Sequence, residues 1–427
     1  MKQFIALLFT ALLSPLIVAT PGEARIDIDI SSAELRKVPI AVPYFIESRT
    51  GETSRPGIEM AEIIAGALEF HGFISVIPPQ SYGGGRQEDW LAAGADFTVV
   101  GSYAEIDDKV TMEIRLLDNS IGRMILGRRY RGEAGKNRIM LLKFADEIIK
   151  TMTGEAGVSL TKISFVAEKN GVKEIYLTDI FGDELRRVTK HHKIAVSPRF
   201  TPDGRFLSYT SYHSGNPNLY LTELAQDKIT TPISRREGLN MAPAWTPDGE
   251  AMAITLSSGG SPDLFLIGRD GEMIRQLTRN AGINVSPSWS PDSRKLAFVS
   301  DRSGTPQIYV MDIKNNSVRR LTYLGNYNST PAWSPKGDQI AYSGYYENRY
   351  HIFLIPAEGG RPTRLTRTLG DHESPSWSPD GRQLAFSRTL DDDRKICAIY
   401  RNGSGFRVLF DWEGNESMPQ WSPRPDY

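Results

Sequence analysis

Histidines are the first place to look for chemistry in this sequence, because imidazole can act as a general base or as a metal ligand. None lies in a His-Glu-x-x-His arrangement or at ligand spacing from a cysteine, and the sequence has no Gly-x-Ser-x-Gly segment. The pair His191-His192 sits between Lys190 and Lys193, which is typical of a solvated basic turn. The sequence therefore favours no catalytic or metal-binding role for its six histidines, which are His71, His191, His192, His213, His351 and His372.

Aspartates that recur in register are the second candidates for chemistry. Each follows Ser-Pro or Thr-Pro, and most are followed by Gly. In such a segment Pro presets φ at the second turn position, Asp suits the third, and Gly ends the turn. The turn already explains these carboxylates, so no acid–base role is assigned to Asp203, Asp248, Asp292 and Asp380.

The turns belong to a unit that repeats along the last three-fifths of the chain. An aromatic residue precedes each turn, with a spacing of 45 and then 44 residues: Phe200, Trp245, Trp289, Trp333, Trp377 and Trp421. The best copy continues with strand-like segments at Lys295–Ser300, Gln307–Asp312 and Arg320–Thr322. A fixed period of roughly 40–45 residues with several short strands and no helix predicts the four-stranded blades of a β-propeller.

The ends of the repeat predict how many blades there are. The strand after the turn occurs six times, at Ile163, Leu207, Met252, Leu296, Ile340 and Leu384. The first copy lacks a preceding Trp-Ser-Pro segment, whereas the segment at Trp421 has nothing after it. We therefore expect a six-bladed propeller over residues 162–427, in which the C-terminal strand around Pro419 to Ser422 completes the blade begun at Lys162 and leaves no free edge.

The N-terminal part has a different pattern. Residues 1–24 resemble a secretory signal, with Lys2, an apolar run from Phe4 to Val18, and small residues near Ala24. A membrane anchor is the alternative, but Ser14-Pro15 interrupts the run, which is short for a bilayer. We expect export with cleavage, so that the mature chain begins near Arg25.

Residues 25–36 and 37–155 are predicted to be an arm and a small α/β domain. The arm alternates isoleucine and aspartate over Arg25–Ile30, so it can pair with a sheet edge. In the domain we expect strands at Phe97–Glu105, Lys109–Leu117 and Arg123–Arg131, a proline-containing edge strand at Pro39–Phe45, and helices over Pro56–Gly72 and from about Lys136 to Met152. The Tyr82–Arg86 glycines read as a surface loop, and Gly154–Leu160 as the domain junction.

Composition limits the partners. The formal net charge is −1, which gives no electrostatic case for binding nucleic acid or an anionic membrane. Cys397 is the only cysteine, so no intramolecular disulfide can form, and its apolar neighbours predict a buried strand thiol. We expect no cofactor, no membrane insertion and a monomer.

What a propeller without catalytic groups offers is a binding surface. The segments that enter the aromatic strands differ between blades while the frame repeats, and they should meet at one mouth of the central channel. We predict a partner site there, made of Val196, Asn240, Met241, Ala242, Asn284, Val285, Asn328, Ser329, His372, Glu373, Glu416 and Ser417.

An exported chain with a small α/β domain followed by six Trp-Ser-Pro-Asp-Gly blades resembles the TolB family, the periplasmic component of the Tol–Pal envelope system of Gram-negative bacteria. The resemblance includes the Arg25–Ile30 arm, Val99-Val-Gly101 and Trp421-Ser-Pro423. It implies a non-enzymatic adaptor whose propeller mouth binds the lipoprotein Pal, with other envelope lipoproteins as further candidates. It also implies that the arm docks TolA through Arg25, Ile26, Asp27, Ile28, Asp29 and Ile30, and that the system serves outer-membrane integrity and cell division.

Two alternatives stay open at this stage. Similar repeats occur in propellers of peptidases related to prolyl oligopeptidase and of pectate-degrading lyases, and a polysaccharide lyase would need a metal or base cluster in the channel. A solute-binding propeller would need a closed apolar pocket. The mouth residues Val196, Met241 and Val285 are apolar at positions where the family that the chain resembles has polar groups.

Overall fold

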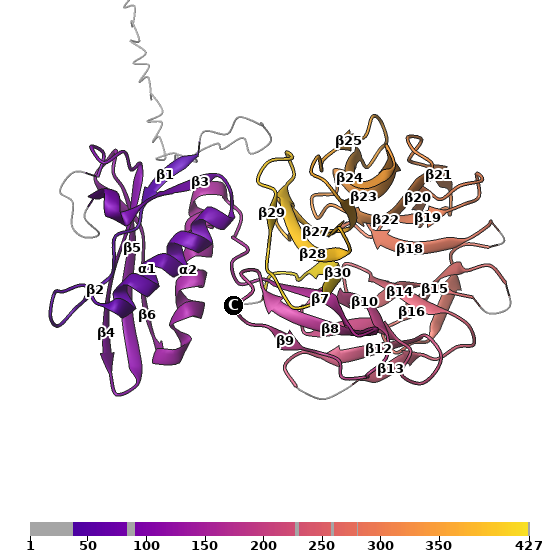
Figure 1. Cartoon of the computed structure of the whole chain (residues 1–427), viewed down its shortest axis with the longest axis horizontal. Helices are drawn as coiled ribbons and strands as arrows, with labels where there is room; N and C mark the ends of the chain where they lie inside the picture. Colours follow the sequence, from indigo (N-terminus) through magenta and orange to yellow (C-terminus); the bar gives the residue numbers. More distant parts are fainter. Residues whose placement is uncertain (1–36, 83–89, 227–229, 258–259, 280, 426–427) are drawn as a thin grey trace, which may run out of the picture.

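The computed structural model describes residues 37–82, 90–226, 230–257, 260–279 and 281–425, which form an α/β domain followed by a β-propeller (Figure 1). The predicted arm, Arg25–Ile30, and the predicted signal segment lie outside the described residues, as do the Tyr82–Arg86 glycines. No helix in the described ranges is long and apolar enough to span a membrane.

The α/β domain contains a sheet with two helices on one face. Its elements are β1 (Val38–Ala41), β2 (Ile46–Glu47), α1 (Arg55–Phe70), β3 (Ile74–Ile77), β4 (Phe97–Ile106), β5 (Lys109–Asp118), β6 (Arg123–Glu133) and α2 (Asn137–Thr153), with one-turn 3-10 segments at Pro79–Tyr82 and Ala134–Lys136. The predicted β-hairpin is confirmed, because Asp107 and Asp108 both have positive φ, as a tight turn requires. Both predicted helices are confirmed, and α2 ends at Gly154 in the left-handed region.

The expectation of an edge strand at Pro39–Phe45 was wrong. The strand is shorter, Val38–Ala41, and lies inside the sheet, parallel to both β3 and β4 in the order β3-β1-β4-β5-β6. Pro39 is tolerated there because the pairing of β1 with β4 begins one residue later, at Ile40 and Phe97, so the missing N–H falls before that ladder. The Pro39 carbonyl accepts a hydrogen bond from the Asp96 amide, 2.9 Å away. The strands at the two ends of this order are β3, which we did not predict, and β6.

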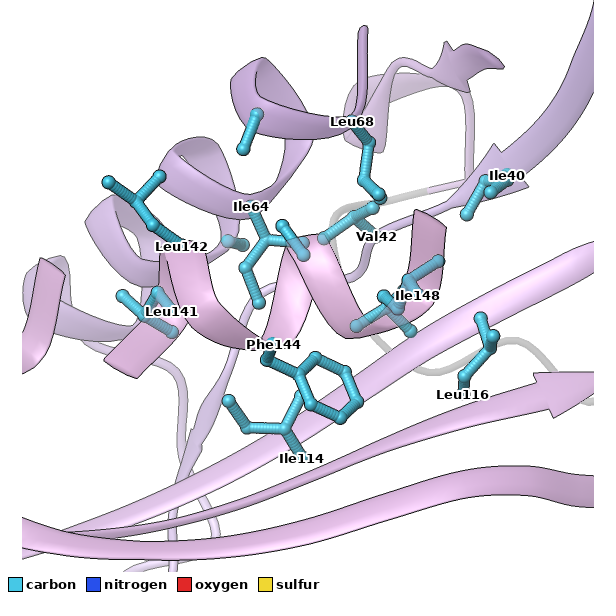
Figure 2. Packing of buried hydrophobic residues seen from close by; sticks show 14 of the residues in the cluster. Ile40, Val42, Ile64, Leu68, Ile114, Leu116, Leu141, Leu142, Phe144 and Ile148 are labelled. Carbon is cyan, nitrogen blue, oxygen red and sulfur yellow. The ribbon is translucent and has the colours of Figure 1, made fainter. Parts of the chain in front are cut away.

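The core of this domain lies between the sheet and the helices. Figure 2 shows Phe144 of α2 pointing onto Ile114 of β5, and Leu68 of α1 lying near Val42. Ile64 of α1 belongs to the same cluster. These side chains are all buried. Burial of each is worth about 1.5–3 kcal/mol relative to exposure, so the amphipathic helices are held by packing on the sheet.

The propeller consists of six four-stranded sheets, which we number as blades 1 to 6. Blade 1 is formed by β7 (Lys162–Lys169), β8 (Val172–Asp179), β9 (Arg186–Arg187) and β30 (Asn415–Trp421); blade 2 by β10 (Ala195–Phe200), β11 (Phe206–Ser211), β12 (Asn218–Glu223) and β13 (Thr231–Ser234); and blade 3 by β14 (Asn240–Trp245), β15 (Ala251–Leu256), β16 (Asp263–Gly268) and β17 (Met273–Gln276). Blade 4 is formed by β18 (Asn284–Trp289), β19 (Lys295–Ser300), β20 (Gln307–Asp312) and β21 (Val318–Arg320); blade 5 by β22 (Tyr327–Trp333), β23 (Gln339–Tyr346), β24 (Arg349–Pro356) and β25 (Thr363–Arg364); and blade 6 by β26 (Asp371–Trp377), β27 (Gln383–Leu390), β28 (Asp393–Tyr400) and β29 (Arg407–Val408).

The predicted closure of the ring is confirmed. Strand β30, the last in the chain, pairs antiparallel with β7, the first strand of the propeller (Figure 1). Trp421 lies opposite Ile163 and is 3% exposed. The pairing removes the free sheet edges that would otherwise remain between the first and last blades.

The Ser/Thr-Pro-Asp-Gly turns all lie at one end of the ring, which we call the turn end. Each turn is fixed by its own side chains: Thr246 Oγ1 donates to Asp248 Oδ1 at 2.6 Å, and Ser290 Oγ to Asp292 Oδ1 at 2.6 Å. Gly204 has φ +68°, and a Cβ there would lie 3.3 Å from Pro423 Cγ of the neighbouring turn. The turns of adjacent blades therefore pack against each other, which confirms the structural role predicted for the recurring aspartates.

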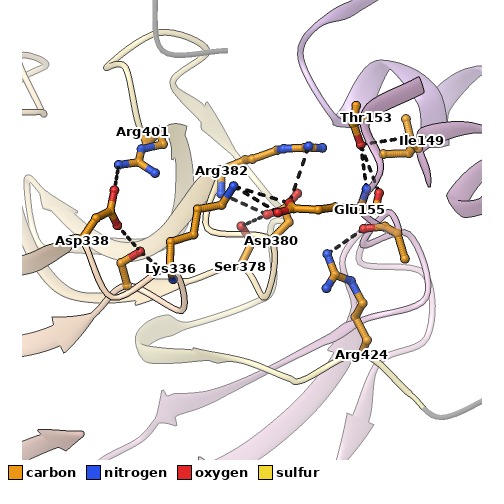
Figure 3. Close-up of polar contacts among 12 residues, drawn as sticks. Ile149, Thr153, Glu155, Lys336, Asp338, Ser378, Asp380, Arg382, Arg401 and Arg424 are labelled. Carbon is orange, nitrogen blue, oxygen red and sulfur yellow. Dashed lines mark hydrogen bonds and ion pairs between the residues drawn. The ribbon is translucent and has the colours of Figure 1, made fainter. Parts of the chain in front are cut away.

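The α/β domain packs against the turn end. Figure 3 shows Glu155 reaching Lys336 and Arg382 in the turns of blades 5 and 6, with nitrogen–oxygen distances of 3.4 and 3.6 Å. Arg424 donates hydrogen bonds to the carbonyls of Gly157 and Ala156. Because these contacts gather at the turn end, the opposite end of the channel carries none of them. We call this opposite end, where the inner strands begin, the mouth.

Candidate binding site at the mouth of the propeller channel

The inner strand of every blade carries a β-bulge near the mouth. The pairing register shifts there, and the bulged residue has a positive φ between 48° and 57° although it is not glycine. A proline follows in each case, which fixes the direction in which the strand continues. The six bulged residues form a ring: Ser197, Ala242, Ser286, Thr330, Ser374 and Met418.

A cavity of about 630 Å³ runs along the channel from the bulge ring to the turn end. The prolines of the six turns line its far end: Pro202, Pro247, Pro291, Pro335, Pro379 and Pro423. Its remaining lining is mainly small, hydroxyl-bearing or aromatic. Such a volume is in the range of ligand-sized cavities, so the channel can accept a peptide segment or a small molecule.

Five of the predicted mouth residues are framework residues in the structure. They occupy one register position, the start of the inner strand, and are at most 1% exposed: Asn240, Asn284, Asn328, His372 and Glu416. Asn328 Nδ2 donates to Gln307 Oε1 at 2.8 Å, and Asn284 Nδ2 donates to Asp263 Oδ1 at 2.9 Å. These side chains tie the inner strand to the third strand of the same blade, and a partner cannot reach them without opening the blade.

Two of these five residues are ionisable, and burial disfavours the charged form of each. Burial lowers the pKa of His372 to about 4, and the ring shares a 2.9 Å hydrogen bond with Thr368 Oγ1. Burial raises the pKa of Glu416 to about 7, against the opposing effect of hydrogen bonds from the Ile396 and Trp412 amides at 2.9 and 2.8 Å. Blades 6 and 1 thus use titrating groups where blades 3 to 5 use asparagine.

Most of the other predicted mouth residues are accessible from the surface or from the channel. Met241, Ala242, Val285, Ser329, Glu373 and Ser417 are partly exposed, whereas Val196 is 8% exposed. Met241, Ala242 and Val285 line the cavity. Burial also raises the pKa of the Glu373 carboxyl. Ala242 belongs to the bulge ring itself, and the others lie between the buried framework position and that ring. The partly exposed ones are the part of the predicted site that a ligand can contact.

Exposed apolar residues at the mouth were missed by the sequence reasoning. Ile194 and Ile283, which directly precede inner strands, are 39% and 44% exposed, and Tyr327 at the start of β22 is 43% exposed. Leu324 and Leu369 in the adjoining connections are also exposed. We call these five residues the apolar rim. They could have been found in the sequence from their position in the repeat, because each lies one to four residues before the buried start of an inner strand.

Blade 5 adds an aromatic cluster to the rim. Tyr327 and Tyr345 both contact Tyr350 edge-on: their ring centroids lie 6.0 and 5.1 Å from that of Tyr350, with interplanar angles of 87° and 62°. Tyr345 is 37% exposed. Tyrosines of this kind offer large contact area at low entropic cost, and they are enriched in the energetically dominant parts of protein interfaces.

Histidine, cysteine and acidic side chains were the candidates for chemistry in the sequence. The described residues contain no group of three or more His, Cys, Asp or Glu side chains that could hold a metal ion. Cys397 is fully buried in β28, as predicted, and burial raises the pKa of its thiol to about 12. His191 lies beside His213, with ring centroids 4.4 Å apart, and its Nδ1 is 2.6 Å from Ser211 Oγ. His191 is thus partly packed, while His192 is exposed as expected.

Family comparisons cover both parts of the chain. A family model described as the TolB beta propeller domain matches residues 149–425, and one described as the TolB amino-terminal domain matches residues 26–125. The first match alone extends over more than half of the 427 residues.

Individual proteins are similar as well. The Tol-Pal system protein TolB of Desulfotalea psychrophila is 45% identical over 220 residues, which are 51% of this chain and 50% of that protein. The one from Desulfosudis oleivorans is 36% identical over 264 residues, 58% of this chain and 59% of that protein. The matched segments thus span about half of these relatives. The crystal structure of TolB from Acinetobacter baumannii superposes with a TM-score of 0.81 over 91% of this chain and 97% of that one; at 24% identity this likeness concerns the fold.

Proposed function

We propose that this chain, which belongs to the TolB family, is a non-enzymatic protein-binding scaffold of a Tol–Pal system, with its main partner docked at the mouth of the propeller channel. The observation that carries the proposal is the placement of the α/β domain at the turn end. It leaves the mouth open and surrounded by the apolar rim.

The chemistry of the mouth suits a folded protein. Scattered exposed apolar side chains are normal, but several around one concave opening are typical of an interaction site. The aromatic cluster provides an anchor, and the partly exposed Glu373 and Ser329 provide polar contacts at the edge. Since the bulges fix the backbone around the ring, the site is rigid, and little conformational entropy is lost when a partner binds.

We propose Pal, the peptidoglycan-associated lipoprotein, as the partner at the mouth. We propose TolA as the partner of the arm, residues 25–36, which lies outside the described residues. A scaffold that holds both would work in the periplasm and link the outer membrane to the inner-membrane Tol complex. Its role would be to support outer-membrane integrity and envelope constriction during cell division.

The proposal is tested by titrating the purified chain, starting at Arg25, with the soluble domain of Pal from the same organism in a calorimeter. We expect saturable binding of one Pal per chain. An absence of binding at micromolar concentrations of both proteins would overturn the assignment of Pal to the mouth.

A further inference from the structure

Arg199 is the only charged residue that the structure places in the lining of the channel cavity. It belongs to β10, two positions beyond the bulge at Ser197. The same position in the other five blades is occupied by uncharged and mostly small residues: Ala244, Ser288, Ala332, Ser376 and Gln420. At this position of the inner strand, blade 2 thus places a guanidinium, whereas the other blades have uncharged and mostly small side chains.

The guanidinium has little to compensate its charge. Nη1 donates a 2.9 Å hydrogen bond to the carbonyl of the adjacent Pro198, and no carboxylate among the described residues forms an ion pair with Arg199. Burial lowers the pKa of Arg199 to about 10, so the side chain is still a cation at neutral pH. Arg199 is only partly buried, so an incoming anion can reach it from the channel, and pairing with that anion would offset the cost of its partial desolvation.

We propose that the channel is a carboxylate-binding site, in which Arg199 receives an acidic side chain that the protein partner inserts through the mouth. The proposal rests on the proposed function, because it assigns a specific contact to the partner docked there. A guanidinium presents N–H groups in a planar fork that matches the two oxygens of a carboxylate. The hydroxyl of Ser197, in the bulge beside it, lines the same cavity and can add a hydrogen bond.

The geometry of the channel favours entry from the mouth. The α/β domain packs against the turn end and leaves the mouth uncovered. The cavity of about 630 Å³ has room for an inserted side chain and its backbone opposite Arg199, because Ala244 and Ala332 project little into it.

Because Arg199 is a single cation, it favours a ligand group with one negative charge. Phosphate groups carry up to two charges and are usually bound by several Arg or Lys side chains together with backbone amides. The cavity lining provides only Arg199, so a monovalent carboxylate is the better match. A small carboxylate in solution has the same chemistry as an acidic side chain. The test must therefore distinguish a side chain inserted by the partner from a dissolved anion.

The experiment compares wild type with Arg199→Gln, Arg199→Lys and a matched control, Arg205→Gln. Arg205 is an exposed arginine of the same blade, outside the cavity. Calorimetric titration with the soluble Pal domain should show at least a tenfold loss of affinity for Arg199→Gln, a smaller loss for Arg199→Lys, and none for Arg205→Gln. Because Arg199→Gln removes an uncompensated cation, its melting temperature should not fall, which separates a binding role from a structural one.

The outcomes distinguish the two proposals. Failure of wild type to bind Pal overturns the proposed function. Normal Pal binding by both wild type and Arg199→Gln overturns the carboxylate site and leaves the proposed function intact. In a second titration, sodium trifluoroacetate is added to the protein without Pal, and its binding is monitored by fluorine NMR. If this probe binds wild type but not Arg199→Gln, while Arg199→Gln leaves the affinity for Pal unchanged, the site binds small dissolved anions. That result would overturn insertion of an acidic side chain by the partner.

Discussion

Trp421 Nε1 donates a 2.8 Å hydrogen bond to Thr161 Oγ1, a residue 260 positions earlier in the chain. Next to it, the Lys162 amide donates to Ser422 Oγ at 2.9 Å, and the Ser422 amide donates to the Lys162 carbonyl at 2.8 Å. The two ends of the propeller therefore meet at the domain junction. The channel and its mouth exist only while this contact holds the ring closed.

The first prediction concerns this closure. Trp421→Ala removes a buried aromatic side chain and its hydrogen bond, and such changes cost about 3–5 kcal/mol of unfolding free energy. Urea denaturation followed by circular dichroism should show this loss. Trp412→Ala is the control, since Trp412 lies in the same blade region but is only partly buried; an equal loss for both variants would contradict a special role of Trp421.

The second prediction concerns Glu416. Burial raises its pKa from 4.5 to about 7, so the folded protein holds a proton that the unfolded chain releases. This contribution is fully present below pH 4.5 and is lost as the pH rises through about 7, at a cost on the order of 3 kcal/mol. Glu416→Gln should remove this dependence, so its unfolding free energy relative to wild type should increase between pH 4.5 and 7.5. Glu237→Gln, at an exposed glutamate in a connecting loop, should follow wild type at every pH.

The third prediction has the opposite sign and concerns His372. Its folded pKa of about 4 lies below the ordinary 6.5, so the stability that depends on the neutral ring is present above pH 6.5 and is lost as the pH falls toward 4. His372→Asn introduces the residue that blades 3 to 5 have at this position. The variant should lose less stability than wild type between pH 6.5 and 4 in denaturant titrations. A steeper acid loss in the variant would refute this explanation.

The fourth prediction tests the mouth. Tyr327→Ala and Ile283→Ser remove exposed apolar side chains of the rim, so each should weaken Pal binding by roughly tenfold or more, as for interface residues that cost above 1 kcal/mol. Melting temperatures should change little, because both side chains are solvent-exposed. Glu373→Lys combined with Ser329→Trp should also weaken capture. Ile274→Ser, at a 55% exposed residue on the outermost strand of blade 3, is the control and should bind as wild type does.

The fifth prediction concerns the arm. A chain that lacks residues 25–32 should bind Pal with unchanged affinity, because the mouth lies at the end of the propeller opposite the α/β domain. It should no longer bind the soluble domain of TolA in a pull-down. Retention of TolA by the shortened chain would place that site elsewhere.

The frame was predictable from the sequence because its signals repeat. Two signals are enough to predict six blades and their closure: the 44-residue spacing from Trp245 to Trp421, and the strand at Lys162, which has no Trp-Ser-Pro segment before it. The α/β domain was harder, since each element occurs once. Strand β3 is only four residues long. The rule that proline favours an edge failed at Pro39, because the pairing of β1 with β4 begins only at the next residue, Ile40.

The site was predicted less well, because a repeat gives the position of a residue along a strand and not the direction of its side chain. Asn328 and Ser329 are neighbours, yet the first is buried in the blade and the second reaches the surface. Ile194 and Tyr327 were missed since apolar residues beside a strand look like core. Arg199 could have been noticed by aligning the blades, where it stands alone among small uncharged residues.

Hydrogen–deuterium exchange of the chain with and without the soluble Pal domain tests the central claim most directly. If the partner docks at the mouth, complex formation should slow exchange in the segments that lead into the inner strands, around Ile194, Ile283 and Tyr327, and leave α2 and the turn end unchanged. Protection confined to the α/β domain or to the outermost strands, with the mouth segments exchanging as in the free protein, would contradict it.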